Sequence, residues 1–507
     1  MSSLKKLQNG SDIRGIALEG VENEAVNLTE DIARTLAGAF CVWLKEKTNN
    51  ANMRISIGCD SRLSGGMLKK AFIEGVTSLG NDASDFGLAS TPAMFMSTVL
   101  EGYEYDGAVM ITASHLPFNR NGFKFFTRDG GLEKQDIAKI IEIAEAAKFN
   151  KAEKAGNVDS IDFMSAYSAY IVDKIRFGIN DKDNFEKPLC GFKIIVDAGN
   201  GAGGFFVEKV LKPLGADTEG SQFLDPDGHF PNHIPNPEDK KAMESICSAT
   251  LENKADLGII FDTDVDRSSA VDKNGKEINR NRIIALMSSI VLAEHASSVI
   301  VTDSITSDEL KEFIESKLGG IHHRFKRGYK NVINEAVRLG VEGKESWLAI
   351  ETSGHGALKE NFFLDDGAYL IAKILIKMAL LRKEGKTIDS LLSELKEPKE
   401  AKEFRLNILC DDFKTYGNMI IEKLTEYAEQ KQELKPAQQN FEGIRVSLDN
   451  ENGDGWFLLR LSLHDPLMPL NIESRKEGGV KQIANTLLNF LKGFDELDVS
   501  TLEMFLN

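Results

Sequence analysis

The sequence predicts an α/β protein with mixed, mostly parallel sheets and a smaller α+β region towards its C-terminal end. The first part of this prediction rests on a recurring pattern of a short apolar strand, a polar loop rich in Gly or Asp, and a helix-like stretch. The pattern occurs at residues 54–65, 193–204 and 298–318. Strands that alternate with helices are typical of α/β units, and ligands usually bind where loops leave the carboxyl ends of such strands.

The α+β prediction rests on a change of pattern late in the chain. A Lys- and Glu-rich segment at 382–402 is interpreted as a linker. Two predicted strands, 443–448 and 456–462, follow it and are flanked by helical runs at 414–430 and 476–492. Because 507 residues are too many for one hydrophobic core, we expect three or four domains of about 100–150 residues each.

Composition restricts the class of protein and its partners. Hydrophobic residues make up 42% and charged residues 27% of the chain, as in an ordinary globular enzyme. The net charge of −17 disfavours nucleic acid and anionic lipid as partners, so an anionic ligand must be held by a local basic cluster. Five scattered cysteines indicate reduced thiols and a cytoplasmic location. The longest apolar run, 368–381, contains two lysines and predicts a helix, not a membrane span.

A serine follows one of the predicted strands, at the end of the apolar segment 106–112. Ser114 and His115 leave the strand end together, and Lys124 returns a positive charge at the start of the next apolar run. A serine placed in this way suits a nucleophile or a phosphoryl carrier, with His115 and Lys124 managing protons and charge. From the loop alone, a capping serine is the commoner explanation.

Three aspartates at alternate positions follow another predicted strand, 257–261. They are Asp262, Asp264 and Asp266. Their oxygens form a cage suited to Mg²⁺, which prefers a few carboxylates together with water and a phosphate oxygen. An EF-hand is excluded because its sixth position requires glycine, and this loop has Arg267 there. A solvated acidic turn is the alternative, and repulsion between carboxylates this close disfavours it.

A loop after residue 348 brings three polar side chains together in the sequence. Glu351, Ser353 and His355 lie within five residues and beside glycines. They suit hydrogen bonds to sugar hydroxyls, with His355 as a proton carrier. A helix N-cap explains the same residues equally well.

A basic group near the C-terminal end suits a phosphate. Arg460 and Ser462 stand at the end of a predicted strand, and Arg475 comes later in the chain. Arginine holds phosphate through forked hydrogen bonds. Taken alone, a surface arginine paired with Asp465 is the better explanation of Arg460.

Taken in this order, the four loops resemble those of the α-D-phosphohexomutase superfamily, which includes phosphoglucomutases and phosphomannomutases. The serine loop of that family, T-A-S-H-N-P followed by N-G-x-K, is matched by Thr112, Ala113, Ser114, His115, Pro117, Asn121, Gly122 and Lys124. The metal loop, D-G-D-x-D-R, is matched by Asp262, Asp264, Asp266 and Arg267. The sugar loop, G-E-x-S-G-H, is matched by Glu351, Ser353, Gly354 and His355. Shorter matches that extend the resemblance over almost the whole chain are Asp12, Arg14, Gly15, Asp60, Arg62, Ser64, Gly87, Thr91, Pro92, Asn200, Gly201, Gly328 and Lys330.

The resemblance implies three similar α/β domains and a smaller C-terminal α+β domain around a central cleft. We expect the serine loop in domain 1–155, the metal loop in 156–280, the sugar loop in 281–398 and the phosphate loop in 399–507. It also implies an intramolecular phosphotransferase that interconverts hexose 1-phosphate and hexose 6-phosphate, of mannose, glucose or both. The reaction is expected to pass through phosphorylated Ser114 and a hexose 1,6-bisphosphate, which also acts as activator. Such a protein is an isomerase of carbohydrate metabolism, expected as a monomer or homodimer with a small sugar phosphate as its partner.

The same resemblance assigns roles to individual side chains. Magnesium is expected to be held by Ser114, Asp262, Asp264 and Asp266. The expected catalytic residues are Ser114, His115, Lys124, Arg267, His355 and Arg14. The expected substrate-binding residues are Glu351, Ser353, Arg460, Ser462 and Arg475.

The chain departs from the family pattern in each of the four loops. Leu116 replaces the usual asparagine, Thr263 the usual glycine, and Ile350 a glycine of the sugar loop. Tyr329 stands where many relatives have histidine. The phosphate loop, usually R-x-S-G-T-E-P, keeps only its arginine, serine and proline in residues 460–466.

Two other functions are compatible with parts of the sequence. A phosphotransferase of the haloacid-dehalogenase type uses a D-x-D pattern, to which Asp262-Thr-Asp264 is similar. A non-catalytic sugar-phosphate-binding regulatory protein is compatible with the altered phosphate loop. The third aspartate and the Ser114 loop argue against the first, and the intact serine, metal and sugar loops argue against the second.

Overall fold

The chain folds into two compact units, which the computed structural model describes over residues 4–146, 149–462 and 465–507. Unit 1 extends to Ile290 and includes Ser353–Leu391, whereas unit 2 comprises Val291–Thr352 and Leu392–Asn507. The division into four domains stays a prediction.

Unit 1 contains a mixed sheet that follows the order β1-β2-β6-β5-β3-β4-β8, with β7 beside β6. Neighbours among β5, β3, β4 and β8 are parallel, whereas β6 is antiparallel to both β5 and β2. The carboxyl end of β5 therefore lies beside the start of β6, and the loop between them carries Ser114. The strands are β1 (Gln8–Asn9), β2 (Asp12–Ile16), β3 (Arg54–Cys59), β4 (Asp82–Leu88), β5 (Gly107–Ile111), β6 (Arg120–Thr127), β7 (Gly130–Gly131) and β8 (Val158–Ser160).

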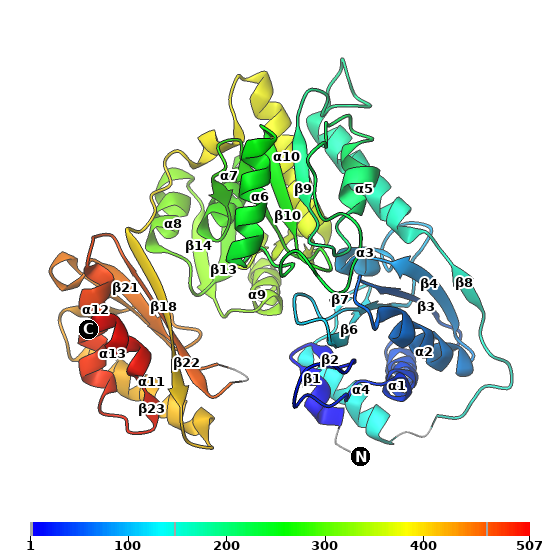
Figure 1. Ribbon diagram of the computed structural model, residues 1–507, viewed down its shortest axis with the longest axis horizontal. Helices are drawn as coiled ribbons and strands as arrows, with labels where there is room; N and C mark the ends of the chain where they lie inside the picture. Colours follow the sequence, from blue (N-terminus) through cyan, green and yellow to red (C-terminus); the bar gives the residue numbers. More distant parts are fainter. Residues whose placement is uncertain (1–3, 147–148, 463–464) are drawn as a thin grey trace. The chain divides into compact units, whose positions relative to one another are not determined.

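Helices cover this first sheet (Figure 1). The helices α1 (Glu30–Thr48), α2 (Gly65–Ser78) and α4 (Lys134–Ala146) enclose one hydrophobic core with β3, β5 and β6. The helix α1 begins where the Thr29 side chain accepts a hydrogen bond from the Ile32 N–H, and it ends at Asn49 in the left-handed conformation. Two further helices, α3 (Thr91–Met96) and α5 (Phe163–Ile179), contact each other.

A second sheet of unit 1 carries the aspartate loop. Its order is β12-β11-β10-β9, with β9 and β10 parallel and the other pairs antiparallel. The strands are β9 (Ile194–Asp197), β10 (Leu257–Phe261), β11 (Ser268–Asp272) and β12 (Glu277–Ile278). The helix α6 (Lys240–Glu252) packs on β9 and β10, and α10 (Gly367–Lys383) contacts β11 and α5. The hairpin of β16 (Gly356–Leu358) and β17 (Leu364–Asp365) precedes α10, and α7 (Asn281–Glu294) follows β12.

Unit 2 contains a parallel group of strands and an antiparallel sheet. The strand β13 (Val299–Asp303) pairs in parallel with β14 (Ile321–Phe325) and β15 (Ser346–Ile350), and α9 (Tyr329–Val341) packs on all three. A short helix, α8 (Asp308–Glu312), follows β13.

The antiparallel sheet of unit 2 follows the order β19-β20-β21-β22-β18-β23. Its strands are β18 (Glu400–Ile408), β19 (Leu434–Pro436), β20 (Ile444–Leu448), β21 (Gly455–Leu459), β22 (Leu467–Ser474) and β23 (Leu497–Asp498). The helices α11 (Phe413–Glu429), α12 (Gly479–Leu491) and α13 (Ser500–Leu506) share one hydrophobic core with it.

The structure corrects the end of the predicted linker 382–402, because its last three residues belong to a strand of the C-terminal sheet. Residues 400–402 begin β18, which pairs with β22 over residues 400–407 and lies between β22 and β23 in the antiparallel sheet. Charged residues alternate there with the buried Phe404, Leu406 and Ile408, so the strand resembles a linker in composition. The predicted strand at 456–462 ends at Leu459.

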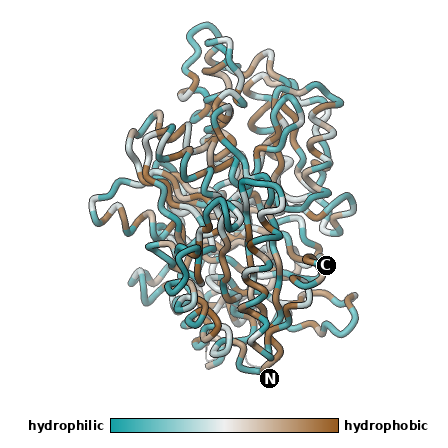
Figure 2. The backbone as a smooth tube through the Cα atoms, turned by 90° about the vertical axis from the view of Figure 1, so that its left-hand side faces the viewer, coloured by the Kyte–Doolittle hydropathy of each residue, from teal (hydrophilic) through white to brown (hydrophobic). Residues whose placement is uncertain are grey.

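The apolar run 368–381 lies within α10, as predicted. No helix in the described part of the chain is long and apolar enough to cross a membrane. Many peripheral loops are hydrophilic in the hydropathy trace of Figure 2.

Candidate active site

Ser114 lies in contact with the aspartate loop of the second sheet. The Ser114 Oγ donates to Asp262 Oδ2 at 3.3 Å, and Arg267 donates to the same Oγ from its Nη2 at 2.8 Å. Ser114 is buried and has a φ of 53°, a left-handed conformation that is uncommon for residues other than glycine. The end of β5 and the end of β10 thus meet through their loops, as the rule for parallel strands predicts.

The three aspartates of the predicted cage gather as expected. Each offers an oxygen within 4.8 Å of the others, and all three are buried. Lys124 from β6 donates to Asp264 Oδ2 at 3.0 Å and to Asp266 Oδ2 at 2.5 Å. Thr91 at the start of α3 also donates its hydroxyl to Asp264 Oδ2. The cage therefore joins groups from both sheets of unit 1.

The charges in the cage do not balance without a further cation. Three carboxylates contact the two positive side chains Lys124 and Arg267, which leaves a net charge of −1 if all are ionised. Burial, followed by the Asp266 charge, raises the pKa of Asp262 well above its ordinary value. Although burial opposes the charge on Arg267, its contacts with Asp262 and Asp266 hold its pKa above the ordinary value.

The donor set fits a hard divalent cation. The Oδ1 atoms of Asp264 and Asp266 are buried, and neither has a hydrogen-bond partner among the described residues. Buried carboxylate oxygens without partners are costly, and oxygen ligands of this kind are those that Mg²⁺ prefers. A cation bound at these oxygens satisfies them and offsets the excess negative charge.

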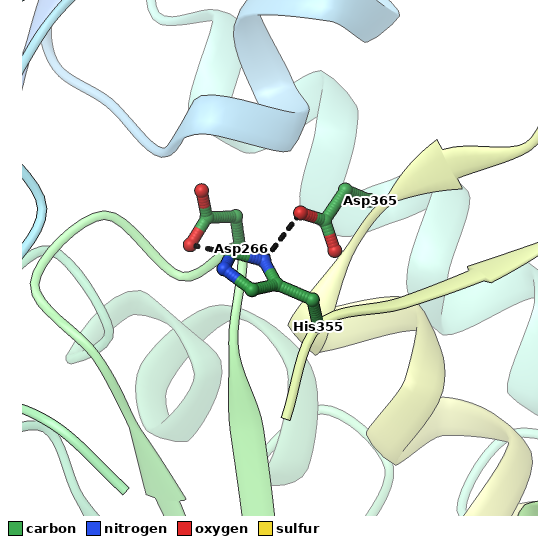
Figure 3. Close-up of side chains that lie close together, drawn as sticks. All are labelled: Asp266, His355 and Asp365. Atoms are coloured by element: carbon green, nitrogen blue, oxygen red, sulfur yellow. Dashed lines mark hydrogen bonds and ion pairs between the residues drawn. The ribbon is translucent and has the colours of Figure 1, made fainter. Parts of the chain in front are cut away.

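His355 brings a third segment, β16 and its preceding loop, to the cage (Figure 3). Its Nδ1 lies 2.5 Å from Asp365 Oδ2 and 3.9 Å from Asp266 Oδ1. The backbone of His355 forms an antiparallel bridge with Arg267, which fixes this loop beside the metal loop. Although burial opposes its charge, Asp365 and Asp266 raise the pKa of His355 to about 9. The imidazole is therefore protonated at neutral pH.

His115 has the opposite character. Its Nδ1 lies 2.6 Å from Arg267 Nη2, and since the guanidinium can only donate, Nδ1 accepts. Burial and the charges of Arg267 and Arg14 lower the pKa of His115 to about 3. Arg14, from β2, is paired with Asp12 at 2.9 Å. His115 is thus a neutral acceptor, and Arg14 contributes positive charge at the same site.

A buried His–Asp pair supports the loop beneath Arg267. His233 Nε2 lies 3.0 Å from Asp197 Oδ2 at the end of β9, and its Nδ1 lies 2.9 Å from the Ile234 carbonyl. Both ring nitrogens therefore donate, which requires the charged imidazolium. Although burial opposes that charge, Asp197 raises the pKa of His233. Three residues further on, the Asn236 side chain accepts from Arg267 Nη1 at 3.2 Å.

The predicted sugar loop is divided between the units. In unit 2, Glu351 is buried and its Oε1 accepts from the Gly328 N–H at 2.6 Å. In unit 1, the buried Ser353 Oγ has no hydrogen-bond partner among the described residues. The predicted N-cap role is absent from both residues in this structure, since the residue that caps α10 is Asp366.

Arg460 lies at the end of β21. Arg327, from the loop between β14 and α9, lies near it. The Arg460 Nε is buried and has no hydrogen-bond partner in the described part of unit 2. Burial, followed by the charge of Arg327, lowers the pKa of Arg460. Ser462 Oγ accepts from the Asp465 N–H at 3.2 Å, and residues 463–464 of the predicted phosphate loop lie outside the described residues.

Arg475 lies at the other end of the β21–β22 pair from Arg460, and its role in binding phosphate stays a prediction. The strands β21 and β22 are antiparallel, with Gly455 opposite Ser474 at one end and Leu459 opposite Leu470 at the other. Four residues of strand separate the two ends, about 14 Å. The Arg475 Nε donates instead to Glu309 at 2.7 Å. In this structure the two arginines therefore lie apart, and Arg475 is paired with an acidic side chain.

Two acidic residues of these sites were not predicted. Asp365 contacts His355, but it precedes Asp366 and Gly367 in a sequence typical of a helix N-cap. Asp303 ends β13 and accepts from the Thr352 hydroxyl at 2.6 Å. The signal that identifies Asp303 is its position at the carboxyl end of a parallel strand, where ligand-binding groups usually lie.

Comparison with known proteins identifies the family of this chain. Models of the phosphoglucomutase/phosphomannomutase α/β/α domains I, II and III match residues 5–151, 165–275 and 279–398. The chain belongs to the phosphoglucomutase/phosphomannomutase family. It is therefore a phosphohexomutase, an isomerase of carbohydrate metabolism, and membership implies a metal-dependent mutase. The predicted fold class, three α/β domains with a further sheet-containing C-terminal domain, is confirmed.

Full-length relatives support this membership of the mutase family. The chain is 30% identical over 475 residues to a phosphoglucomutase of Neisseria meningitidis, with 94% of each chain covered. It is 31% identical over 464 residues to a phosphoglucomutase/phosphomannomutase of Thermococcus kodakarensis, with 91% of this chain and 94% of the relative covered. A solved phosphoglucomutase/phosphomannomutase family protein of Burkholderia thailandensis has a TM-score of 0.77 and 25% identity, with 96% of each chain covered.

Proposed function

We propose that this mutase interconverts the 1-phosphate and 6-phosphate of glucose, mannose or both through a phosphorylated Ser114. The observation that carries the proposal is the contact of Ser114 Oγ with Arg267 at 2.8 Å and with Asp262 at 3.3 Å. A hydroxyl held between a guanidinium and a carboxylate cage suits the attachment and transfer of a phosphoryl group.

In the proposed reaction, the bond between phosphorus and Ser114 Oγ breaks as a bond forms to the free hydroxyl oxygen of the sugar phosphate. The proton of that hydroxyl passes to a base, and the product is a hexose 1,6-bisphosphate. Ser114 Oγ takes up a proton as it leaves. In the second transfer the other phosphorus bonds to Ser114 Oγ as its bond to the sugar oxygen breaks; the Ser114 proton passes to the base and the sugar oxygen takes up a proton, which restores the phosphorylated enzyme. Arg267 offsets the negative charge of the phosphoryl oxygens, because its guanidinium contacts Ser114 Oγ, the oxygen to which the phosphorus is bonded.

Lys124 and His355 differ as candidates for the base. Two carboxylates raise the pKa of His355 to about 9, so it enters the reaction as a proton donor. Lys124 lies as an ammonium within hydrogen-bond distance of Asp264 and Asp266, so it must first give up a proton before it can act as the base. We therefore assign His355 as the acid, Lys124 as the base, and His115 as the neutral acceptor that orients Arg267.

Magnesium is the proposed cofactor, held by Asp262, Asp264, Asp266 and the phosphorylated Ser114. When bound, it offsets negative charge during phosphoryl transfer. The buried Oδ1 atoms of Asp264 and Asp266, which have no hydrogen-bond partner among the described residues, favour this assignment. We also propose that a hexose 1,6-bisphosphate activates the enzyme by phosphorylating Ser114.

In unit 2, we propose that Arg460 and Ser462 bind the phosphate that is not transferred, while Glu351 binds ring hydroxyls. Arg460 has a buried nitrogen with no partner among the described residues, and Arg327 adds positive charge near it. In unit 1, Ser353 offers a second hydroxyl for the sugar. The monomer or homodimer state and the cytoplasmic location stay predictions.

Phosphorus NMR tests the proposed reaction directly. The protein is incubated with MgCl₂, a trace of glucose 1,6-bisphosphate, and glucose 1-phosphate or mannose 1-phosphate. We expect the 6-phosphate of at least one sugar to appear, and intact-mass measurement to find one phosphate on Ser114. The Ser114→Ala variant is expected to lose both, whereas Ser165→Ala, an exposed serine of α5, is expected to retain them.

Two outcomes decide between the proposal and its alternatives. Full activity of Ser114→Ala would exclude a phosphoserine mechanism, and a hydroxylamine-labile phosphate on Asp262 would instead favour a haloacid-dehalogenase mechanism. Binding of sugar phosphates without conversion of any hexose would favour the regulatory protein.

A further inference from the structure

The loop that carries Ser114 closes around a single buried guanidinium, that of Arg62. Its Nη1 donates to the carbonyls of Pro117 at 2.8 Å and Arg120 at 3.0 Å. Its Nη2 donates to the carbonyls of Leu116 at 2.5 Å and of Ser114 itself. The Arg62 side chain has no exposed surface. Every terminal N–H of the guanidinium therefore has its own carbonyl acceptor within one loop.

Four carbonyl oxygens that converge in a buried place repel one another unless a cation lies among them. The planar fork of arginine supplies four terminal donors in fixed directions, whereas lysine supplies three from one atom. Asp60 lies 3.5 Å from Arg62 Nε and balances its charge. Burial lowers the pKa of Arg62 and raises that of Asp60 to about 6, so this pair is held at some cost to both charges.

The contacts of Arg62 reach the backbone of the nucleophile itself. The Ser114 N–H donates to the Thr112 hydroxyl at 2.9 Å, and the Ser114 carbonyl accepts from Arg62. Both peptide groups of Ser114 are thus fixed while its φ of 53° holds the residue in the left-handed region. That conformation is unfavourable for serine and persists only where neighbouring contacts determine it. The direction of Ser114 Oγ towards Arg267 and Asp262 follows from this fixed backbone.

We propose that Arg62 is the positioning residue that fixes Ser114 for phosphoryl transfer, a role that rests on the proposed function of Ser114. Arg62 donates its side-chain hydrogen bonds to backbone carbonyls of the loop, and so it acts on Ser114 through the loop backbone. Its loss leaves the groups that bind the sugar phosphate in unit 2 unchanged. The expected defect is therefore in kcat and in the phosphorylation of Ser114, and not in KM.

The variants Arg62→Met and Arg62→Lys test the fork geometry. A displacement of about 1 Å in a reacting group lowers the rate by about 100-fold, which is the loss of kcat expected for Arg62→Met with KM within threefold. Arg62→Lys keeps the charge but satisfies fewer carbonyls, so we expect an intermediate loss. The matched control is Arg120→Gln, which removes a half-exposed guanidinium of the same loop that binds the Glu24 side chain.

Two readouts separate positioning from general damage to the fold. Ethylguanidinium added to Arg62→Ala is expected to raise kcat at least tenfold and to leave the wild type unchanged, because the ion replaces the missing fork. Hydrogen exchange of the unphosphorylated protein is expected to accelerate at least tenfold in residues 112–122 of Arg62→Met. Exchange in β9 and β10 of the second sheet is expected to stay at the wild-type rate.

The outcomes also separate this inference from the proposed reaction. Wild-type kcat in Arg62→Met, or wild-type exchange in residues 112–122, would overturn the role of Arg62. A wild-type protein that converts no hexose would refute the proposed reaction alone. The role of Arg62 would then be decided by two comparisons of Arg62→Met with the wild type: the rate of hydrogen exchange in residues 112–122, and the phosphorylation of Ser114 by glucose 1,6-bisphosphate.

Discussion

Lys124 supplies one of the positive charges that contact the buried aspartates, and we predict that Lys124→Met destabilises unit 1 unless a divalent cation is present. Its ammonium contacts Asp264 and Asp266, whose side chains are 0% and 1% exposed. Removing one partner of a buried ion pair costs about 3–5 kcal/mol, because the other charge stays buried without compensation. We therefore expect a loss of this size in the free energy of unfolding in EDTA.

Magnesium is expected to bind the variant more tightly than the wild type. Without Lys124, the cage of three carboxylates and Arg267 has a net charge of −2 instead of −1. Two unit charges 4 Å apart interact by about 4 kcal/mol at an effective dielectric constant of about 20, an upper limit here because the lysine can turn away. A tenfold gain in affinity, about 1.4 kcal/mol, is the minimum we expect.

Urea unfolding and calorimetric titration with MgCl₂ measure the two effects. Trp43 lies in unit 1, whereas Trp347 and Trp456 lie in unit 2, so their replacement by Phe makes fluorescence report unit 1. The matched control is Lys373→Met, since Lys373 is another buried lysine of unit 1 and pairs with Glu360 at 3.0 Å. The control is expected to lose stability with and without MgCl₂ and to keep the wild-type affinity.

Wild-type stability of Lys124→Met in EDTA would show that its contacts with the aspartates contribute little. A lower affinity of the variant for Mg²⁺ would show that Lys124 does not compete with the cation for these oxygens. Either result would refute the charge balance inferred for the cage.

Three further predictions concern other parts of the chain. Gly122→Ala is expected to lower the free energy of unfolding by about 3 kcal/mol or more in urea titrations, because a Cβ there would lie 2.2 Å from a carbonyl oxygen of the neighbouring strand. The control is Gly66→Ala in α2, where an added Cβ has no atom within 4 Å; it is expected to stabilise the protein by about 0.5–1 kcal/mol. The pKa of His233 is raised above its ordinary 6.5, so its contribution to stability is complete below about pH 6.5 and is lost as pH rises through the raised value. His233→Gln is expected to remove this pH dependence from the free energy of unfolding, measured from pH 6 to 9. An unchanged pH profile in the variant would contradict the prediction. Arg460→Met is expected to weaken binding of glucose 6-phosphate about tenfold by calorimetry, whereas Arg475→Met, which loses only a half-exposed ion pair, is expected to stay within threefold.

The sequence was informative where strands are apolar and their loops carry uncommon residue combinations. The strands β5 and β10 read as continuous buried runs, so Ser114 and the aspartates could be placed at their carboxyl ends. β18 was missed because it is an alternating strand with charged residues on one face, and its composition resembles a linker. Asp365 was missed because a carboxylate before a helix is normally a cap.

By itself, the sequence determined the α/β class, the presence of a serine, a metal and a sugar loop, and the mutase family that these loops resemble. Only the tertiary structure decided which of the charged groups meet. It joined His355 to Asp365, gave Arg62 four carbonyls of the Ser114 loop, and separated Arg475 from Arg460. The physical reason is that motifs record neighbours along the chain, whereas pKa values and anion sites depend on charges brought together by strand order and register across a sheet.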